Sequence, residues 1–332
     1  MQIFHHFNDL PADARGAAVA VGNFDGVHRG HQAVIDEAGR IARAADLPWA
    51  VLTFEPHPRS VFKPDIEPFR LTPFQSKARH IDALGVDCLI VLQFDLPFSR
   101  WPAERFIDDV LLKGLEARHV VSGYDFVFGH GRKGNCELLL HKGAQAGFGF
   151  TSVTAVVDEA SEVFSATRVR GKLAAAEPRA ATQILGRFFE IEGAVEHGEK
   201  RGQTIGFPTA NLRLDETLRP AKGVYAVRVS IGEGPYPRWR DGVANLGTRP
   251  TFAGDDLILE VYLFDFDGDL YGQHLRVALV DYLRPEKKFD GLDDLKAQIG
   301  RDIEAARDIL GGLEDPAETI KAPALNRQRA NR

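Results

Sequence analysis

Apolar residues recur in two different patterns along the chain, and the change of pattern divides it into two parts. In the first part, short apolar runs of strand length alternate with stretches in which apolar residues recur at the helical period. The expected strands are 17–22, 50–54, 88–92, 119–123 and 151–156, and the expected helices are 31–45, 75–84, 103–113, 135–146, 167–176 and 179–185. This alternation predicts an α/β domain with a parallel sheet covered on both faces.

After residue 186 the sequence changes to strand-like segments interrupted by glycine and proline, which is typical of an antiparallel β-barrel or sandwich. The expected strands are 188–196, 223–230, 241–247, 257–264 and 275–282. An amphipathic helix is expected over 292–310, with Leu295, Ile299, Ile303, Ala306 and Leu310 on one face. We therefore expect domains at residues 1–185 and 186–313, followed by a flexible tail over 314–332.

The composition is that of an ordinary globular protein and argues against several classes. A length of 332 residues is enough for two cores, and a net charge of −6 argues against a surface built for nucleic acid. Cys88 and Cys136 lack the spacing of a metal site and indicate reduced thiols. With no signal-peptide pattern and no long apolar run, we expect a cytoplasmic protein, a monomer or weak homo-oligomer, that binds neither nucleic acid nor membrane.

The segment 22–31, G-N-F-D-G-V-H-R-G-H, lies where the first expected strand ends and the first long helix begins. Ligands bind at this edge of a parallel sheet, and a helix N-terminus favours phosphate. His28 and His31 could both donate to one polyphosphate, as attack on the α-phosphorus of ATP requires. From the residues alone, two surface histidines remain an alternative. A zinc pair is a third reading, although no Cys, Asp or Glu follows at helical ligand spacing.

This segment resembles the H-x-G-H signature of nucleotidyltransferases, in the form found in bacterial bifunctional riboflavin kinases/FAD synthetases. Residues 123–134 are similar to that family's second block, G-x-[DN]-F-x-F-G-x-x-x-x-G, and residues 165–170 to its S-S-T-x-x-R block. The resemblance implies a Rossmann-like domain that converts FMN to FAD, with His28 and His31 as catalytic residues. The ATP-binding residues it implies are Gly22, Phe24, Asp25, Gly26, His28, His31, Asp125, Ser165, Thr167 and Arg170. Ala166 departs from the pattern and removes one hydroxyl.

Two other nucleotide-binding patterns have partial matches in the chain. Residues 129–134 spell G-x-G-x-x-G before a helix, but the expected strand ends six residues earlier, and Arg132 and Lys133 make the loop bulky and basic. A dinucleotide-binding fingerprint is therefore disfavoured. No Walker-type loop exists, because Gly171-Lys172 is followed by Leu173.

The segment 202–212, G-Q-T-I-G-F-P-T-A-N-L, is short enough to be only a turn between strands. Thr209 and Asn211 are two apart, so in an extended chain they face the same side and can contact a phosphate or a magnesium shell. The segment resembles the G-x-T-x-G-F-P-T-A-N-L signature of riboflavin kinases. The resemblance implies that Thr209 and Asn211 hold Mg²⁺ and ATP, together with Gly202, Gly206 and Pro208.

The resemblance to riboflavin kinases continues through residues 223–225, 245–252, 259–265 and 283–284 and on to about Gly311. It implies that Glu260 is the general base for the terminal ribityl hydroxyl, and it gives Asn245, Arg249 and Arg284 as flavin-binding candidates. Taken alone, a single Glu in a strand is more often a solvated residue. Residues 265–276 do not form a calcium loop, because Leu270 and Arg276 occupy the positions of the required Gly and Glu.

The sequence therefore predicts a flavin-cofactor enzyme that uses ATP twice, first to make FMN from riboflavin and then to make FAD from FMN. A kinase with a degraded first domain is the nearest alternative, and Ala166 is its only support. An enzyme that uses flavin for redox chemistry and a nucleic-acid-binding module leave no comparable motif.

Overall fold

The computed structural model describes residues 1–196, 206–232, 238–251 and 254–313. The chain forms two compact units. The first unit comprises Met1–Glu67 and Thr72–Ala166, and the second comprises Pro68–Leu71 and the chain from Thr167 onward. The predicted tail over 314–332 lies outside the described residues.

The first unit is built on a fully parallel six-stranded sheet in the order β1-β4-β3-β2-β5-β6. Its strands are β1 (Gln2–Phe4), β2 (Ala18–Val21), β3 (Trp49–Glu55), β4 (Cys88–Gln93), β5 (His119–Gly123) and β6 (Gly149–Val153). The parallel sheet confirms the predicted fold class. The sequence missed the short β1, and β6 begins and ends earlier than expected.

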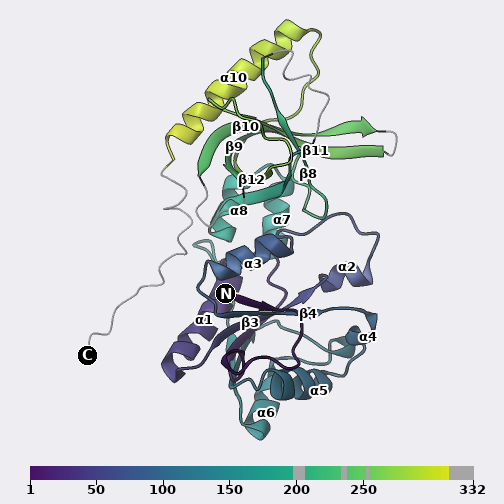
Figure 1. Ribbon diagram of the computed structural model, residues 1–332, viewed down its shortest axis with the longest axis vertical. Helices are drawn as coiled ribbons and strands as arrows, with labels where there is room; N and C mark the ends of the chain where they lie inside the picture. Colours follow the sequence, from purple (N-terminus) through teal and green to yellow (C-terminus); the bar gives the residue numbers. More distant parts are fainter. Residues whose placement is uncertain (197–205, 233–237, 252–253, 314–332) are drawn as a thin grey trace, which may run out of the picture. The chain divides into compact units, whose positions relative to one another are not determined.

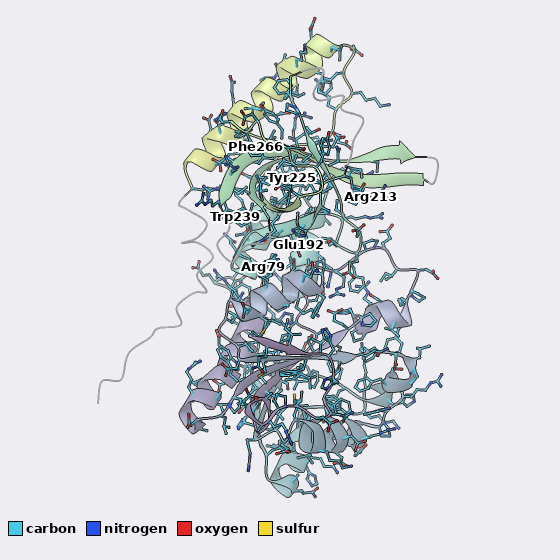
Figure 2. The ribbon with its side chains drawn as sticks, viewed as in Figure 1. Arg79, Glu192, Arg213, Tyr225, Trp239 and Phe266 are labelled. Atoms are coloured by element: carbon cyan, nitrogen blue, oxygen red, sulfur yellow. The ribbon has the colours of Figure 1, made fainter. Side chains whose placement is uncertain are left out.

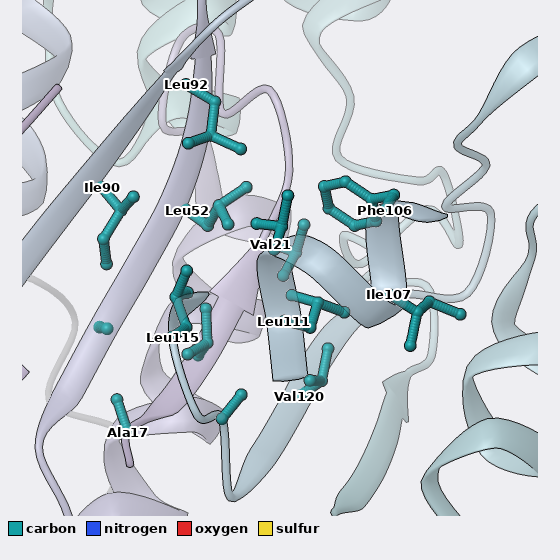
Figure 3. Packing of buried hydrophobic residues seen from close by; sticks show 14 of the residues in the cluster. Ala17, Val21, Leu52, Ile90, Leu92, Phe106, Ile107, Leu111, Leu115 and Val120 are labelled. Carbon is teal, nitrogen blue, oxygen red and sulfur yellow. The ribbon is translucent and has the colours of Figure 1, made fainter. Parts of the chain in front are cut away.

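Two apolar layers cover the two faces of this sheet, because side chains alternate along each strand. Val19 and Val21 point to the layer shared with Ile107 and Leu111, whereas Ala18 and Ala20 point to the layer shared with Ile35. Figure 3 shows the first layer, in which Val21 and Leu52 of the sheet face Phe106 and Leu111. The expected burial of both faces is therefore confirmed.

The helices of the first unit follow the predicted pattern with small shifts at their ends. They are α1 (Arg29–Ala45), α2 (Pro58–Phe62), α3 (Phe74–Asp82), α4 (Leu96–Ser99), α5 (Ala103–Arg105) and α6 (Cys136–Ala146). The segment Phe106–Gly114 is a π-helix that continues α5, so the helix expected over 103–113 exists in a wider form. The short α2 and α4 carry no amphipathic period, which is why the sequence did not indicate them.

The second unit contains α7 (Ala166–Ala174) and α8 (Pro178–Leu185), followed by an antiparallel sheet in the order β7-β12-β9-β10-β11-β8. Its strands are β7 (Phe189–Ala194), β8 (Ala210–Arg213), β9 (Gly223–Ile231), β10 (Trp239–Thr251), β11 (Gly254–Leu263) and β12 (His274–Arg284). The amide of Glu196, just after β7, donates to the carbonyl of Asn211 on β8 at 2.9 Å. This bond joins the two outer strands of the sheet, so the strands form a barrel (Figure 1).

Tyr225 is the largest fully buried side chain of the barrel and is labelled among its strands in Figure 2. Its hydroxyl donates to the carbonyl of Ala221, and its ring lies edge-on to that of Tyr282 with centroids 5.1 Å apart. Burial raises the pKa of Tyr225, so the hydroxyl stays protonated and keeps its donor role.

The closing helix α10 (Leu292–Gly311) packs on β9, β10 and β12 and is drawn in yellow in Figure 1. Ala306 and Leu310 are buried against Val224 and Ala226 of β9. Of the face predicted from the sequence, Ile303, Ala306 and Leu310 join this core, whereas Leu295 and Ile299 stay partly exposed. The C-terminal half of α10 therefore packs against the barrel more closely than the N-terminal half does.

Candidate functional sites

The order of the parallel sheet identifies one edge where a ligand can bind. After β2 the chain crosses to β3 on one side, and after β5 it crosses to β6 on the other, although β2 and β5 are neighbours. The loops after these two strands therefore diverge at their carboxyl ends, which is the usual ligand position in open α/β sheets. Both motifs predicted for nucleotide binding, 22–31 and 123–134, follow these two strands.

The loop between β2 and α1, residues 22–28, is called the histidine loop here. Phe24 and Val27 have φ values of 49° and 39°, and Gly26 has 87°, so the chain turns sharply before the helix. Gly30 allows the start of α1 to approach the segment before α7, because a Cβ there would lie 3.0 Å from the carbonyl oxygen of Phe164. Gly30 therefore serves a close backbone contact within the protein.

His28 and His31 lie together at the start of α1. His28 is the N-cap residue, and its Nδ1 accepts from the backbone N–H of His31 at 3.3 Å. The two rings stack, with centroids 3.6 Å apart and planes inclined by 21°. His28 is 6% exposed, and the ring of Phe24 stands edge-on to His31. Because Nδ1 of His28 accepts, a neutral His28 carries its proton on Nε2, and this nitrogen is then the donor of the ring.

Asp25 is buried and holds a segment distant in sequence. Its Oδ1 accepts from the backbone N–H of Thr72 at 3.1 Å, and Thr72 Oγ1 in turn accepts from the N–H of Gly26 at 2.9 Å. These two bonds tie the middle of the histidine loop to the residue just before the N-cap of α3. Asp25 is 3% exposed, so the geometry assigns its carboxylate at least a loop-holding role.

The second predicted block forms the loop between β5 and α6. Asp125 is exposed in this loop, and Phe128 and Gly134 pair through two backbone hydrogen bonds that close it. Strand β5 ends six residues before Gly129, so the disfavoured dinucleotide fingerprint indeed lacks its strand.

The third predicted block spans the boundary between the two units. Ser165 is half-buried in the first unit just before α7, and Thr167 and Arg170 lie on α7 in the second. Within the second unit, Arg170 Nε donates to the carbonyl of Phe69 at 2.9 Å, and its guanidinium lies over the Phe69 ring.

The sequence missed an aromatic cluster in the first unit. Phe62 on α2 is 59% exposed, and its ring meets that of Phe94 with centroids 5.7 Å apart. Contacts between neighbouring rings continue from Phe94 through Phe54, Phe106 and Phe128 to Phe126. The chain has 22 Phe residues, and their concentration over residues 54–128 could have indicated this aromatic cluster from the sequence.

In the barrel, the strand register brings three predicted kinase residues into one row. Glu260 on β11 pairs with Asn211 on β8 and, on its other side, with Asn245 on β10. Directly paired residues of antiparallel strands point to the same face, so these three side chains share one side of the sheet. That side also carries Val224, which packs against α10.

Asn211 is 7% exposed, and its Oδ1 has no hydrogen-bond partner among the described residues. A buried amide oxygen normally has one, so a ligand at this position would supply it. Amide, hydroxyl and carboxylate oxygens are the donors that Mg²⁺ prefers, and Thr209, Asn211 and the neighbouring Glu260 provide all three types. These residues therefore fit the predicted metal.

The structure describes some of the other predicted kinase residues and leaves two of them undescribed in whole or in part. Gly206 has a φ of 90°, and Pro208 is exposed next to the half-buried Thr209. Gly202 lies outside the described residues, and the Arg249 side chain is likewise not described.

Arg284, predicted as a flavin-binding residue, is engaged by α10. Its Nε lies 2.9 Å from Asp302 Oδ1, and its Nη2 lies 2.7 Å from Asp302 Oδ2. Nη1 donates to the carbonyl of Pro285, and the guanidinium lies 5.9 Å from the centroid of the Phe289 ring. These contacts tie β12 to α10 and account for the guanidinium without a ligand.

Each unit thus carries one candidate site. The first is a histidine pair at the N-terminus of α1, at the sheet edge, and the second is a row of polar residues on the barrel. Among the residues that the structure describes, no helix is long and apolar enough to span a membrane. No cluster of three His, Cys, Asp or Glu side chains suited to a metal occurs in that part of the chain. The zinc reading of the histidine pair therefore gains no support.

Comparison with known proteins matches both units. The FAD synthetase family model matches residues 10–168, and the riboflavin kinase model matches residues 185–310. The bifunctional riboflavin kinase/FMN adenylyltransferase of Escherichia coli K12 is 44% identical over 314 residues, 94% of this chain and 98% of the relative. The enzyme of the same description from Bacillus subtilis is 36% identical over 311 residues, 92% of this chain and 96% of the relative.

A solved structure is similar over most of the chain. It is a crystal structure from Streptococcus pneumoniae titled macrolide-efflux protein, with a TM-score of 0.81 and 32% identity, and the match covers 93% of this chain and 99% of that one. Its arrangement supports the fold described above. Because relatives of one description match nearly the full length of both partners, the chain belongs to the bifunctional riboflavin kinase/FMN adenylyltransferase family.

Proposed function

We propose that the two activities of the family are carried by separate sites, with the histidine pair serving adenylyl transfer and the barrel row serving phosphorylation. The enzyme converts riboflavin and ATP to FMN and ADP, and then FMN and ATP to FAD and pyrophosphate. The observation that carries the division of labour is the register of the barrel, which aligns Glu260 with Asn211 and Asn245.

In adenylyl transfer a phosphate oxygen of FMN attacks the α-phosphorus of ATP, and pyrophosphate leaves. No protein nucleophile is needed, because the attacking and leaving groups are both phosphates, and catalysis consists of positioning and charge stabilisation. His28 would donate through Nε2 to the triphosphate, and His31 would stand beside it.

The remaining nucleotide-binding residues of the proposal come from the family motifs. Backbone groups at Gly22, Phe24 and Gly26 would approach the nucleotide, with Asp25 acting through the loop that it holds. Asp125 and Ser165 of the first unit would contribute to the ATP site, and Ala166 supplies no hydroxyl there. Thr167 and Arg170 are proposed as ATP-binding residues on the family motif alone. The exposed face of Phe62 is our candidate for contact with the apolar flavin ring of FMN.

In the kinase reaction the terminal ribityl hydroxyl of riboflavin attacks the γ-phosphorus of ATP, and ADP leaves. Glu260 would accept the hydroxyl proton as the oxygen–phosphorus bond forms. Thr209 and Asn211 would hold Mg²⁺ and the ATP phosphates, with Gly202, Gly206 and Pro208 shaping the loop. The bound cation would neutralise phosphate charge. Asn245 and Arg249 are proposed flavin contacts, and Arg284 would act by holding α10.

The functional domains of this proposal are residues 1–185 for adenylyl transfer and 186–313 for the kinase, with 314–332 as a tail. We place the enzyme in the cytoplasm, in keeping with two free cysteines, as a monomer or weak homo-oligomer.

Chromatographic separation of riboflavin, FMN and FAD tests the proposal directly. Glu260→Gln should abolish FMN formation from riboflavin while added FMN is still converted to FAD. His28→Asn should lower FAD formation from FMN by about 100-fold while FMN formation from riboflavin continues, because one phosphate donor is lost and the rest of the site remains. Asparagine keeps an N-cap acceptor for α1 but removes the Nε2 donor, so it separates the helix-capping role from phosphate binding.

His28→Ala is the matched comparison, because it removes both roles. If His28→Asn formed FAD at the wild-type rate, the cap alone would account for the histidine. If either Glu260→Gln or His28→Asn stopped both reactions in a folded protein, the division between the sites would be wrong.

A further inference from the structure

Buried polar side chains of the first unit gather around one loop. Those that the structure describes are Asp25, His28, Thr53, Thr72, Ser76, Lys77 and Ser122. They lie in the histidine loop, near the carboxyl ends of β3 and β5, or at the start of α3. Burying polar groups costs free energy unless they are hydrogen-bonded, so their concentration at one place calls for a local reason.

Lys77 is the extreme case, with a side chain that is 0% exposed. Its Nζ lies 2.7 Å from Oε1 of Glu55, at the end of β3, and Glu55 is 17% exposed. The same Nζ lies 3.4 Å from Oγ1 of Thr53. An ammonium group is among the most costly groups to bury, and an apolar residue would fill the same volume with less penalty.

Thr53 connects Lys77 to the histidine loop. Its hydroxyl donates to the backbone carbonyl of Asn23 at 3.1 Å, while its oxygen accepts from Lys77. A threonine hydroxyl has one hydrogen and two lone pairs, so both bonds can exist together, and the adjacent cation strengthens the hydroxyl as a donor. Asn23 is the residue just before the turn at Phe24.

The histidine loop is thus held at two points by α3 and the segment before it. Thr72 holds its middle through Asp25 and Gly26, and Lys77 holds its beginning through Thr53 and Asn23. The loop ends at His28, the N-cap residue of α1, so a shift at Asn23 would move the imidazole.

We propose that Thr53 and Lys77 are positioning residues for adenylyl transfer, which fix the start of the histidine loop so that His28 and His31 meet the phosphates in reacting geometry. This inference rests on the proposed role of the histidine pair. Neither side chain touches the nucleotide in this account.

The test compares Thr53→Val with Thr53→Ser in the full-length enzyme. Valine has nearly the shape of threonine but no hydroxyl, whereas serine keeps the hydroxyl and loses a methyl group. FAD formation from FMN is measured over a range of ATP concentrations, so that kcat and KM are obtained separately. Thr53→Val should lower kcat by about tenfold or more with KM for ATP changed less than about threefold, because misplacement weakens the transition state most. Thr53→Ser should stay within about threefold of wild type.

Three controls make the result specific. FMN formation from riboflavin in the same preparation should be unchanged, since the kinase residues lie in the second unit. Lys77→Met should resemble Thr53→Val, whereas Lys113→Met, which removes a lysine that is 74% exposed and paired with Asp109, should be neutral. In a His28→Asn background, Thr53→Val should cost clearly less than tenfold, because one of the two histidines that it positions is already absent.

The inference is overturned if Thr53→Val matches Thr53→Ser in kcat, or if Thr53→Val still costs tenfold in the His28→Asn background. Should Lys77→Met not fold, the comparison of Thr53→Val with Thr53→Ser still tests the inference. A fully active His28→Asn enzyme would instead contradict the proposed function, so the two failures are distinguishable.

Discussion

Asp302→Ala should loosen α10, because it removes the partner of Arg284. The carboxylate of Asp302 is 8% exposed and receives three contacts from Arg284 Nε and Nη2, between 2.7 and 3.1 Å. It also accepts from Gln298 at 2.9 Å. Breaking a fully buried ion pair costs about 3–5 kcal/mol, and the 21% exposure of Arg284 reduces this, so we expect about 2 kcal/mol.

Hydrogen exchange of the 292–311 peptides, followed by mass spectrometry, reports the stability of this helix separately from the first unit. A loss of about 2 kcal/mol corresponds to roughly 30-fold faster exchange when opening is rapid. Asp265→Ala is the matched control, since Asp265 also pairs with an arginine of α10, Arg307, but is 78% exposed. An exposed pair contributes less than about 1 kcal/mol, so exchange should rise no more than about fivefold.

Replacing both partners, Arg284→Met with Asp302→Leu, should restore part of the protection, because no buried charge remains unpaired. The reasoning is refuted if Asp302→Ala exchanges no faster than Asp265→Ala. In that case Arg284 would not hold α10, and its predicted role in flavin binding would regain weight.

Three further outcomes are expected. Gly223→Ala should destabilise the barrel by about 2 kcal/mol or more, because Gly223 has a φ of 146° and a Cβ there would overlap the Arg284 carbonyl. Gly300→Ala, in open space on α10, should stabilise the protein by up to about 1 kcal/mol. Thermal unfolding, followed through the loss of kinase activity, measures both effects. A maleimide at pH 8 should label the half-buried Cys136 before Cys88, whose pKa burial raises to about 11, and equal labelling by mass spectrometry of the folded protein would contradict this. Burial lowers the pKa of His119 from its usual 6.5, so on acidification the unfolded chain binds this proton before the folded protein does. The free energy of unfolding should therefore fall as the pH drops below about 6.5. His119→Gln should make that pH dependence weaker, as urea titrations at several pH values would show.

The predicted residues of the first site show what a single sequence reveals. His28 and His31 are neighbours along the chain, so their meeting at the start of α1 followed from local structure alone. Asp25 could not be interpreted in the same way, because its partner Thr72 is 47 residues away. Lys77 gave no signal either, since a lysine on a short helix is normally solvated.

The barrel shows the same limit on a larger scale. The pattern of Asn211, Asn245 and Glu260 fixed only which side of its own strand each residue occupies. Their alignment in one row depends on β11 pairing with both β8 and β10 in one register. A shift of one residue would have turned Glu260 to the opposite face.

The sequence by itself determined most of the longer strands and helices, the change from an α/β pattern to an antiparallel β pattern, and the motifs that resemble those of two nucleotide-using activities. These features are local, because periodicity and turn residues act over a few positions. Only the tertiary structure decided which buried groups meet: Thr72 with Asp25, Lys77 with Thr53, and Arg284 with Asp302. Such pairs depend on strand order, register and helix packing, which arise when distant segments bury their apolar faces together.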